Sequence, residues 1–402
     1  FKTKDQVSAE LNDAIGKYNF KVKGHGMNVS ITSAEAGIAL DADEVAQAII
    51  DSQDPWRWPL SLFSERDVSQ AVADAMSATG LADVIQAEVD RVNATAYPPV
   101  DATVAYVEDA KAFEVIPEVP GTMLDVEKVL EATIAGTLVL DDNIILTRDA
   151  LVQPQVFEDD KRLSQAALEA NRLVKANVTL NLSGTDIAVV DASVIWPWVE
   201  ISPDFAVVFN ADKMNEWAAD IASKCNTVGS TRTYTRPDGK VITVSGGSYG
   251  WRINSESLIQ SITDAINTGT IGVIDIPVEQ AGSGFVSLGG QDWGKRYVDV
   301  DLSEQYARFY DDTGAIIWES AIVSGLPREG RATPKGVYFL NQKASPSTLI
   351  GYKPDGTKDY ESKVQYWMPF KGNSVCLHDA DWQSSFGGRR YLSSGSHGCV
   401  NL

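Results

Sequence analysis

The hydrophobic residues in the first part of the chain change their spacing several times. Residues 20–33 alternate apolar and polar side chains around Gly24 and Gly26, and this period of two predicts β-strands. Residues 64–94 repeat apolar side chains at helical spacing, after a segment at 54–59 that we interpret as a loop. Strands and helices that alternate over so short a stretch predict an α+β domain.

The same order of elements is predicted a second time further along the chain. The pattern indicates a helix over 162–175, strands over 177–190 and another helix over 211–224. The turn residues Pro-Asp-Gly at 237–239 lie between two alternating runs, which predicts a β-hairpin. The second half therefore repeats the α+β pattern of the first.

Glycines and helix-capping residues recur at matching places in the two halves. Asp125 and Asn254 are residue types that cap the N-terminus of a helix, and an apolar helical run follows each of them. We predict a tandem pair of α+β domains, 1–155 and 156–290. The alternative is that two unrelated α+β stretches share these glycines and capping residues by chance. The matching residues are Gly121, Asp125 and Glu127 in the first half and Gly250, Asn254 and Glu256 in the second.

Short strands dominate the rest of the chain. Residues 280–296 are rich in Gly, Ser and Gln, and we interpret them as a linker. Beyond them, residues 306–310 and 316–323 flank a hairpin turn, and 297–302 and 337–340 are further predicted strands.

The predicted fold class is therefore multidomain. Two tandem α+β domains are followed by a β-rich third domain over 291–402, with mixed β-sheets in a sandwich-like arrangement. Apolar residues make up 44% of the 402 residues, which is enough for ordinary hydrophobic cores in each domain. No apolar run of about 18 residues is present, so the sequence predicts no membrane-spanning segment.

The net charge of the chain and its first residue bear on its binding partners and its location in the cell. The formal net charge of −21 argues against nucleic acid or an anionic membrane surface as the main partner. Because the chain begins at Phe1 in place of Met, we expect an export signal or a membrane anchor upstream of it.

A cysteine and a histidine near the C-terminal end are the candidate catalytic pair. Cys399 is flanked by Gly398, and His378 lies upstream of both. A thiol becomes an effective nucleophile when an imidazole takes its proton, and the same imidazole can later protonate a leaving amine. The glycine leaves room for a carbonyl group and lets backbone N–H groups turn toward an oxyanion. The alternative is a buried cysteine beside a tight turn, with histidines that play no chemical part.

Metal binding is a further alternative for the same segment. Cys376, His378, His397 and Cys399 could supply ligands, but the paired C-x-x-C spacing of structural zinc sites is missing. Three cysteines, of which Cys225 is the remaining one, do not make a disulfide framework. We therefore expect no metal site in this segment.

The residues around this pair resemble the signature of the L,D-transpeptidase catalytic domain, the YkuD type. His378 is followed by the segment Ser-His-Gly-Cys-Val-Asn at 396–401, and Thr-Pro-Lys-Gly at 333–336 is similar to the family's Thr-Pro-x-Gly turn. The resemblance covers about 294–402 and its motif is highly specific. The tandem domains more loosely resemble the scaffold domains, described as peptidoglycan-binding, that precede this catalytic domain in Gram-positive bacteria.

The resemblance implies a role for each matching residue. Cys399 would be the nucleophile, His378 the general base and then the acid, and Asp379 would orient the imidazole through its carbonyl or its side chain. For Tyr366, Trp367 and Trp382, which would line the cleft, plain aromatic packing is the alternative. The implied set is completed by His397 and Ser396, which shape the site, by the Gly398 and Cys399 amides as oxyanion donors, and by Asn401, which holds substrate.

The implied reaction is acyl transfer between peptidoglycan stem peptides, without a cofactor. Cys399 would attack the carbonyl of the third residue of a donor tetrapeptide, and the terminal D-residue would leave. An amine of an acceptor stem would then attack the thioester and give a 3→3 cross-link. The family also implies acylation of the cysteine by β-lactams of the carbapenem class, and a location at the cell wall, outside the cytoplasmic membrane of a bacterium.

Other interpretations stay open. With water as the acceptor the enzyme would be an L,D-carboxypeptidase, and with a vestigial catalytic domain the chain would be a cell-wall binding or scaffold protein. A sortase-like or papain-like peptidase lacks the local patterns of those families. The chain ends at Leu402 directly after the motif, whereas family members continue for a strand or more, so we expect a C-terminal truncation.

Cys376 supports one additional hypothesis. It lies two residues before His378, so in a strand both side chains share one face. Cys376 would then lie near Cys399 and could form a reversible disulfide with it under oxidation. The alternative is a buried cysteine that only fills space.

Overall fold

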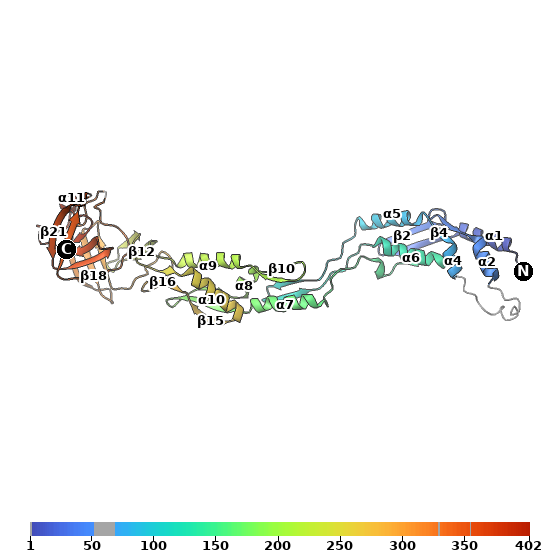
Figure 1. Cartoon of the computed structure of the whole chain (residues 1–402), viewed down its shortest axis with the longest axis horizontal. Helices are drawn as coiled ribbons and strands as arrows, with labels where there is room; N and C mark the ends of the chain where they lie inside the picture. Colours follow the sequence, from blue (N-terminus) through green and yellow to red (C-terminus); the bar gives the residue numbers. More distant parts are fainter. Residues whose placement is uncertain (1, 52–68, 329, 354) are drawn as a thin grey trace. The chain divides into compact units, whose positions relative to one another are not determined.

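The chain divides into two compact units, which Figure 1 shows in a computed structural model. Unit 1 consists of Phe1–Ala105 and Phe113–Ala167, and unit 2 of Tyr106–Ala112 and Leu168–Leu402. The loop expected at 54–59 and the beginning of the helical run at 64 lie outside the described residues. The structure describes residues 2–51, 69–328, 330–353 and 355–402.

Unit 1 is built on a three-stranded sheet. Strand β1 (Asn19–Gly24) pairs antiparallel with β2 (Met27–Thr32) and parallel with β7 (Asn143–Ile145). Apolar residues of α1 (Lys4–Lys17), α5 (Leu81–Asn93) and α6 (Val126–Leu138) pack against this sheet in one hydrophobic core. The core is closed from water, since Val22, Ile85 and Val129 are fully buried.

Two details of unit 1 correct the sequence prediction. The helical run expected over 64–94 is interrupted by β4 (Met76–Ala78), between α4 (Ser69–Ala75) and α5. Strand β4 pairs with β3 (Ile38–Leu40), which precedes α2 (Ala42–Asp51), so its side chains reach the core with a period of two. The sequence also indicates a strand over about 137–147, but α6 extends to Leu138 and only β7 is a strand there.

The predicted helix cap of unit 1 is confirmed. The Asp125 carboxylate accepts hydrogen bonds from the backbone N–H groups of Glu127 at 2.9 Å and Lys128 at 3.2 Å, at the start of α6. A hairpin of β5 (Thr103–Val107) and β6 (Ala112–Ile116) precedes this helix, and a 3-10 turn, η1 (Arg148–Ala150), follows β7.

Unit 2 contains a sheet with the topology of the first. After α7 (Lys161–Leu173), β8 (Asn177–Leu182) pairs antiparallel with β9 (Thr185–Val190) and parallel with β15 (Ile271–Asp275). Strand β15 follows α10 (Ser255–Thr268), whose N-terminus is capped by Asn254 through the Ser257 N–H at 3.0 Å. The same order of elements thus occurs twice: a helix, a two-stranded hairpin, a later helix with a capped N-terminus, and a strand that pairs in parallel with the first strand of the hairpin.

Smaller elements complete the α+β part of unit 2. The predicted turn at 237–239 is confirmed, because β12 (Thr231–Thr235) and β13 (Val241–Ser245) form an antiparallel hairpin around it. The remaining elements are α8 (Ala192–Ile195), η2 (Trp196–Trp198), β10 (Val199–Ile201), β11 (Val207–Phe209), α9 (Ala211–Cys225), β14 (Arg252–Ile253) and β16 (Val278–Gln280).

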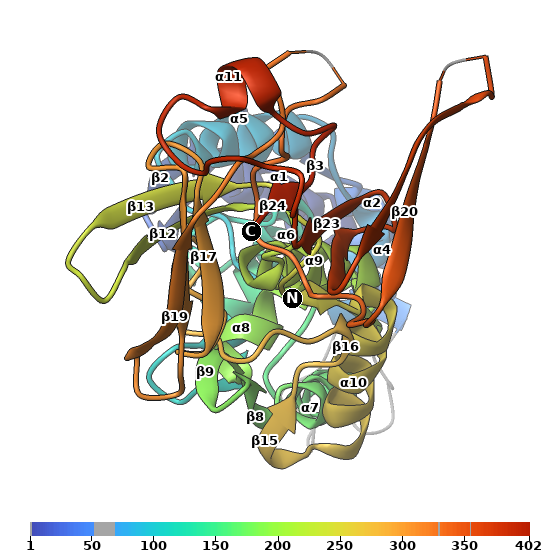
Figure 2. The ribbon, with the colours of Figure 1, turned by 90° about the vertical axis from the view of Figure 1, so that its left-hand side faces the viewer.

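The C-terminal part of unit 2 is β-rich. One sheet consists of β17 (Tyr297–Asp301), β18 (Tyr306–Tyr310) and β19 (Ile316–Ala321), and a second of β22 (Trp367–Lys371), β23 (Val375–His378) and β24 (Val400–Asn401). Both sheets contribute to one core through Ala307, Leu377 and Val400. The hairpin of β20 (Ser347–Tyr352) and β21 (Lys358–Val364) projects from this domain in Figure 2.

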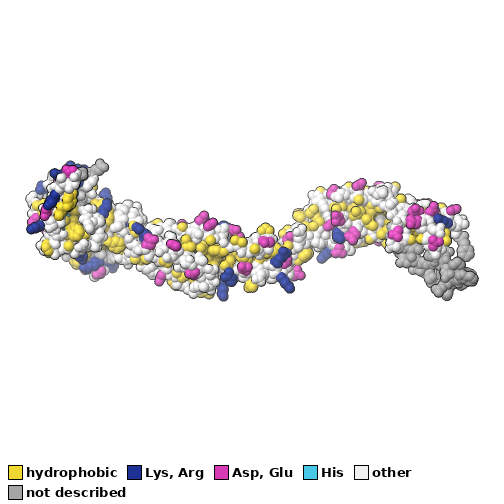
Figure 3. Space-filling model, in the orientation of Figure 1, with side chains coloured by type: hydrophobic (Ala, Val, Ile, Leu, Met, Phe, Trp, Pro, Cys, Tyr) yellow, Lys and Arg dark blue, Asp and Glu magenta, His cyan; other side chains and the backbone are white. Residues whose placement is uncertain are grey.

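The fold class is therefore multidomain, with mixed α+β parts followed by a β-rich C-terminal domain, as the sequence predicts. One expected strand is absent: within the described residues, 337–340 contributes only an isolated bridge between Val337 and Gly247. No helix among the described residues is long and apolar enough to cross a membrane. Acidic side chains are spread over the visible face of both units in Figure 3, so the charge of −21 is not gathered into one patch there.

The β12–β13 hairpin is bound to the β-rich domain by buried ion pairs. Arg232 is paired with Asp292 at 3.0 Å, and both side chains are almost fully buried. Arg236 lies 3.3 Å from Asp299, to which the Tyr234 hydroxyl donates a 2.6 Å hydrogen bond. Although the expected linker 280–296 contains no helix or strand after Gln280, it is therefore anchored within unit 2.

We expect Asp292→Ala to lower the free energy of unfolding of unit 2 by about 3–5 kcal/mol, because it leaves the Arg232 guanidinium buried without its counter-charge. Chemical denaturation followed by tryptophan fluorescence measures this. The matched control is Asp312→Ala, which removes an exposed ion pair with Arg296 and should leave stability nearly unchanged. Equal stabilities of the two variants would contradict the assigned role of the buried pair.

Candidate active site

Cys399 lies in a short turn that leads into β24. Gly398, directly before it, has a φ of +121°, a backbone conformation that glycine adopts readily and other residues do not. Strand β24 pairs in parallel with β23, with Leu377 opposite Val400. Continued by one residue, this register places Cys399 beside Cys376 of β23. Because side chains alternate along a strand, Cys376 and His378 lie on the same face of β23.

His378 is buried at the end of β23 with one ring nitrogen already engaged. Its Nδ1 lies 2.8 Å from the backbone carbonyl oxygen of Asp379. Because a carbonyl oxygen only accepts, Nδ1 carries the proton in this hydrogen bond, and the lone pair of the neutral ring is on Nε2. One ring nitrogen of His378 lies within 4.8 Å of the sulfurs of both Cys376 and Cys399. The imidazole thus lies beside both thiols, with its proton held on Nδ1.

The surroundings of Cys399 favour its thiolate. The Cys376 Sγ lies 3.4 Å from the Cys399 Sγ, and a hydrogen bond from the Cys376 thiol is the largest cause that lowers the pKa of Cys399, to about 5. Burial opposes this shift, and the hydrogen bond and charge of His378 add to it. The same contact raises the pKa of Cys376, so of the two sulfurs Cys399 carries the negative charge.

The carboxylate of Asp379 has a separate function from its carbonyl. It accepts backbone hydrogen bonds from Gln365 at 2.9 Å and from Tyr366 at 2.6 Å. Burial alone would raise the pKa of Asp379, but these two N–H groups hold it below its ordinary value. Asp379 therefore orients the imidazole through its carbonyl, while its side chain fixes the segment before β22.

Ser396 and Thr333 hold the turn around Cys399. The Ser396 hydroxyl donates to the Cys399 carbonyl at 2.6 Å and accepts from the Gly398 N–H at 3.0 Å. The Thr333 hydroxyl donates to the Gly398 carbonyl at 2.9 Å and accepts from the Gly325 N–H at 2.9 Å. The sequence indicates Thr333 only as part of a turn motif, because its contact with Gly398 depends on the fold.

The two amides expected in the oxyanion hole differ in availability. The Gly398 N–H donates to Ser396, whereas the Cys399 N–H has no acceptor among the residues that the structure describes. The Cys399 amide is therefore the one free to donate to a bound group.

The structure brings some of the other expected site residues to the pair and leaves others apart. The Trp382 ring lies 5.7 Å from the His378 ring, and Asn401 is buried opposite His378 in the strand register. The His397 ring lies 5.6 Å from that of Tyr360, and its Nε2 lies 3.6 Å from Asp359. Burial and the nearby Arg331 lower the pKa of His397. Tyr366 contributes its backbone N–H to Asp379 and has an exposed side chain.

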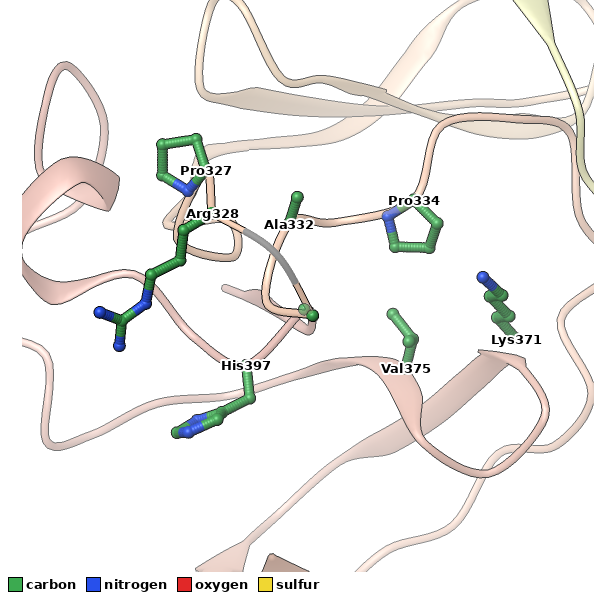
Figure 4. Close-up of a pocket in the computed structure, with 9 residues that line it drawn as sticks. Pro327, Arg328, Ala332, Pro334, Lys371, Val375 and His397 are labelled. Carbon is green, nitrogen blue, oxygen red and sulfur yellow. The ribbon is translucent and has the colours of Figure 1, made fainter. Parts of the chain in front are cut away.

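A pocket of about 550 Å³ opens beside the turn of Cys399. Figure 4 shows Pro327, Ala332 and Pro334 on one side of it and His397, Val375 and Lys371 on the other. Arg328 and Lys371 bring positive charge to this pocket, and neither forms an ion pair with a described residue. Tyr366 and Trp382, which were expected along the cleft, do not line it. Its lining residues are Pro327, Arg328, Gly330, Ala332, Pro334, Lys371, Val375, His397 and Gly398.

Three side chains at the site are of the types that bind soft metal ions. The donor atoms of Cys376, His378 and Cys399 lie within 4.8 Å of one another, and among the described residues this is the set that could hold an ion such as Zn²⁺. A structural zinc site has four ligands, and His397, the other candidate, is turned toward Tyr360. We assign these side chains to thiol chemistry.

The low pKa of Cys399 gives a test of the site that needs no substrate. The rate of alkylation of Cys399 by iodoacetamide should stay nearly constant from about pH 8 to about pH 6 and fall roughly tenfold per pH unit below about pH 5, where the thiolate is protonated. Mass spectrometry of the labelled peptide measures the rate. A free cysteine peptide serves as the control and should lose reactivity already below about pH 8.5. If the alkylation rate of Cys399 depended on pH in the same way as that of the free peptide, the assignment of Cys399 as a thiolate would be wrong.

Two family models match the chain. Residues 295–402 match the L,D-transpeptidase catalytic domain (YkuD), and residues 159–275 match the model described as "Putative peptidoglycan binding domain". A search of the curated proteins found no match.

Solved structures similar to this chain come from Enterococcus faecium. The catalytic domain of its L,D-transpeptidase, solved by NMR, is 44% identical over 27% of this chain and 80% of that domain, with a TM-score of 0.24. The same domain acylated by ertapenem is 42% identical over 28% of this chain and 83% of that chain, with a TM-score of 0.25. The crystal structure of the L,D-transpeptidase C442S mutant is 27% identical over 58% of this chain and 90% of that chain, with a TM-score of 0.48.

The residues that match the YkuD model, 295–402, include Cys399, His378 and the turn described above. With a YkuD catalytic domain at 295–402 preceded by a peptidoglycan-binding domain at 159–275, the chain belongs to the L,D-transpeptidase family.

Proposed function

We propose that the chain is a cysteine-dependent L,D-transpeptidase that forms 3→3 cross-links between peptidoglycan stem peptides. The observation that carries the proposal is the pair of Cys399 and His378: the Asp379 carbonyl holds the proton on Nδ1, and a ring nitrogen of His378 lies within 4.8 Å of the Cys399 sulfur. The proposed domain division is 1–155, 156–290 and 291–402, with the first two as scaffold domains that bind peptidoglycan.

In the first half of the reaction, the Cys399 thiolate attacks the carbonyl carbon of the third residue of a donor tetrapeptide. The oxyanion that develops accepts a hydrogen bond from the Cys399 N–H, the free amide of the turn. Nε2 of His378, protonated by the thiol, gives its proton to the leaving amine of the terminal D-residue. The C–N bond breaks and a thioester on Cys399 remains.

In the second half, a side-chain amine of an acceptor stem attacks the thioester carbon. Nε2 of His378 takes a proton from this amine, the C–S bond breaks, and Cys399 returns to its thiolate. Ser396, Thr333 and Asn401 hold the turn and the strand that position the reacting atoms. Arg328 and Lys371 provide positive charge in the adjoining pocket, where a carboxylate of a stem peptide would be stabilised.

The proposed partners and location follow from the same chemistry. The ertapenem adduct of the E. faecium domain supports β-lactams as covalent inhibitors that acylate Cys399. Peptidoglycan as the substrate places the enzyme at the cell wall, outside the cytoplasmic membrane, with an anchor upstream as one means of attachment.

The test incubates the whole chain with purified disaccharide-tetrapeptide and follows the products by mass spectrometry. A cross-linked dimer that appears together with free terminal D-residue is the expected result. A monomer that only loses its terminal residue would show an L,D-carboxypeptidase instead. If well-folded protein binds peptidoglycan but produces neither, the scaffold interpretation is correct and the proposed function is wrong.

A further inference from the structure

Cys376 contacts the nucleophile but takes no bond-making step in acyl transfer. Its side chain is 1% exposed, in the middle of β23, and its Sγ lies 3.4 Å from the Cys399 Sγ. An apolar side chain of similar size would fill this space equally well. A thiol in contact with a thiolate can, in addition, form a disulfide with it.

The backbone around the two cysteines suits a covalent link between them. Leu377 is opposite Val400 and His378 opposite Asn401 in the parallel pair of β23 and β24. The same register, continued by one residue, brings Cys376 opposite Cys399. Adjacent strands lie about 4.8 Å apart, which is inside the Cα–Cα range of about 4.4–6.8 Å that disulfides span. The sulfurs need to approach by only about 1.4 Å, which side-chain rotation can supply.

We propose that Cys376 and Cys399 form a reversible disulfide site whose oxidising substrate is a peroxide. In the first step, the Cys399 thiolate attacks one oxygen of hydrogen peroxide, the O–O bond breaks, and a sulfenic acid and hydroxide form. In the second step, the sulfur of Cys376 attacks the sulfenic sulfur, and its proton and the sulfenic hydroxyl leave as water. Two thiols are oxidised and one peroxide is reduced to two waters.

The positions of the two residues assign their order. Cys399 is the more exposed of the two, beside the pocket that Gly398 lines, so peroxide reaches it first. Cys376 is buried behind it, and the His378 ring nitrogen, within 4.8 Å of both sulfurs, can take the proton of Cys376 as it attacks. The disulfide would block acylation and would protect Cys399 from further oxidation to the irreversible acids. This consequence for activity rests on the proposed function, whereas formation of the disulfide does not.

The experiment counts free thiols in the whole chain after treatment with a small excess of hydrogen peroxide. The protein is unfolded without reductant, alkylated with N-ethylmaleimide and weighed. We expect three alkylated cysteines before treatment and one afterwards, and that one should be Cys225, which is fully buried in α9. A digest should contain the peptide that links Cys376 to Cys399, and dithiothreitol should restore all three thiols.

Two variants make the result decisive. Cys376→Ser keeps a hydrogen-bond donor beside Cys399 but removes the second sulfur, so peroxide should drive Cys399 to sulfinic acid, which dithiothreitol does not reverse. Cys225→Ser should keep the linked peptide. The proposal is overturned if wild-type Cys399 is also found as sulfinic acid while Cys376 remains alkylated. Because the readout is mass, a chain that forms the disulfide but reacts with no stem peptide would contradict only the proposed function.

Discussion

Cys399→Ala is expected to abolish the covalent adduct that the wild-type chain forms with a carbapenem. In the wild type, the thiolate that Cys376 and His378 stabilise attacks the strained lactam carbonyl, and the mass of the protein rises by one drug molecule. Alanine removes the attacking atom and leaves the turn between Gly398 and β24 intact, so binding without acylation should remain. Mass spectrometry of the intact protein after incubation with ertapenem measures the outcome.

Cys225→Ala is the matched control for this experiment. Cys225 is also a free cysteine of unit 2, but it is fully buried at the end of α9, and burial raises its pKa to about 11. Its loss should leave the adduct in place. An adduct that persists in Cys399→Ala would show that another residue is the nucleophile. An adduct absent from well-folded wild type would remove the support for an acyl-enzyme.

His378→Gln should lower the rate of acylation by about 10²–10⁴-fold, the usual contribution of a positioned general base. Glutamine can still donate a hydrogen bond to the Asp379 carbonyl, as Nδ1 does at 2.8 Å, but it cannot take a proton from the thiol. The pKa of Cys399 should rise as well, because the hydrogen bond and the charge of His378 both lower it. Stopped-flow measurement of acylation against pH separates the two effects.

The other two histidines provide the controls for this variant. His25→Gln changes a turn residue of unit 1 and should leave the rate unchanged. His397→Gln should have a smaller effect than His378→Gln, because its ring lies beside Tyr360 and its Nε2 is 3.6 Å from Asp359. If His397→Gln proved the more damaging of the two, the base would have to be reassigned.

The local features of the fold were predictable from the sequence, and the long-range ones were not. The caps at Asp125 and Asn254 and the turn at 237–239 depend on a few neighbouring residues, and all three are confirmed. Strand β4 was missed because its pairing with β3 bridges a gap in the sequence that no local pattern reveals. Likewise, Val337 forms an isolated bridge with Gly247, whose approach is so close that an added Cβ would lie 1.9 Å from the Val337 carbonyl oxygen.

The same limit applies to the candidate site. The motif indicated Cys399 and His378, and spacing alone placed Cys376 on the face of His378. Which group of Asp379 orients the ring, and which of the two turn amides is free, depend on backbone directions that a motif does not encode. The distance of 3.4 Å between the sulfurs follows from the register of β23 and β24, which only the assembled sheet provides.

The buried ion pairs of the β12–β13 hairpin bear on how such enzymes can be recombined. A chimaera joined within 280–296 would take Arg232 and Arg236 from one parent and Asp292 or Asp299 from the other. Unless both parents carried the same charges, the new protein would bury a cation without its partner. The unit that can be exchanged between relatives therefore begins before β12, so the hairpin is inherited together with the catalytic domain although it precedes that domain in the chain.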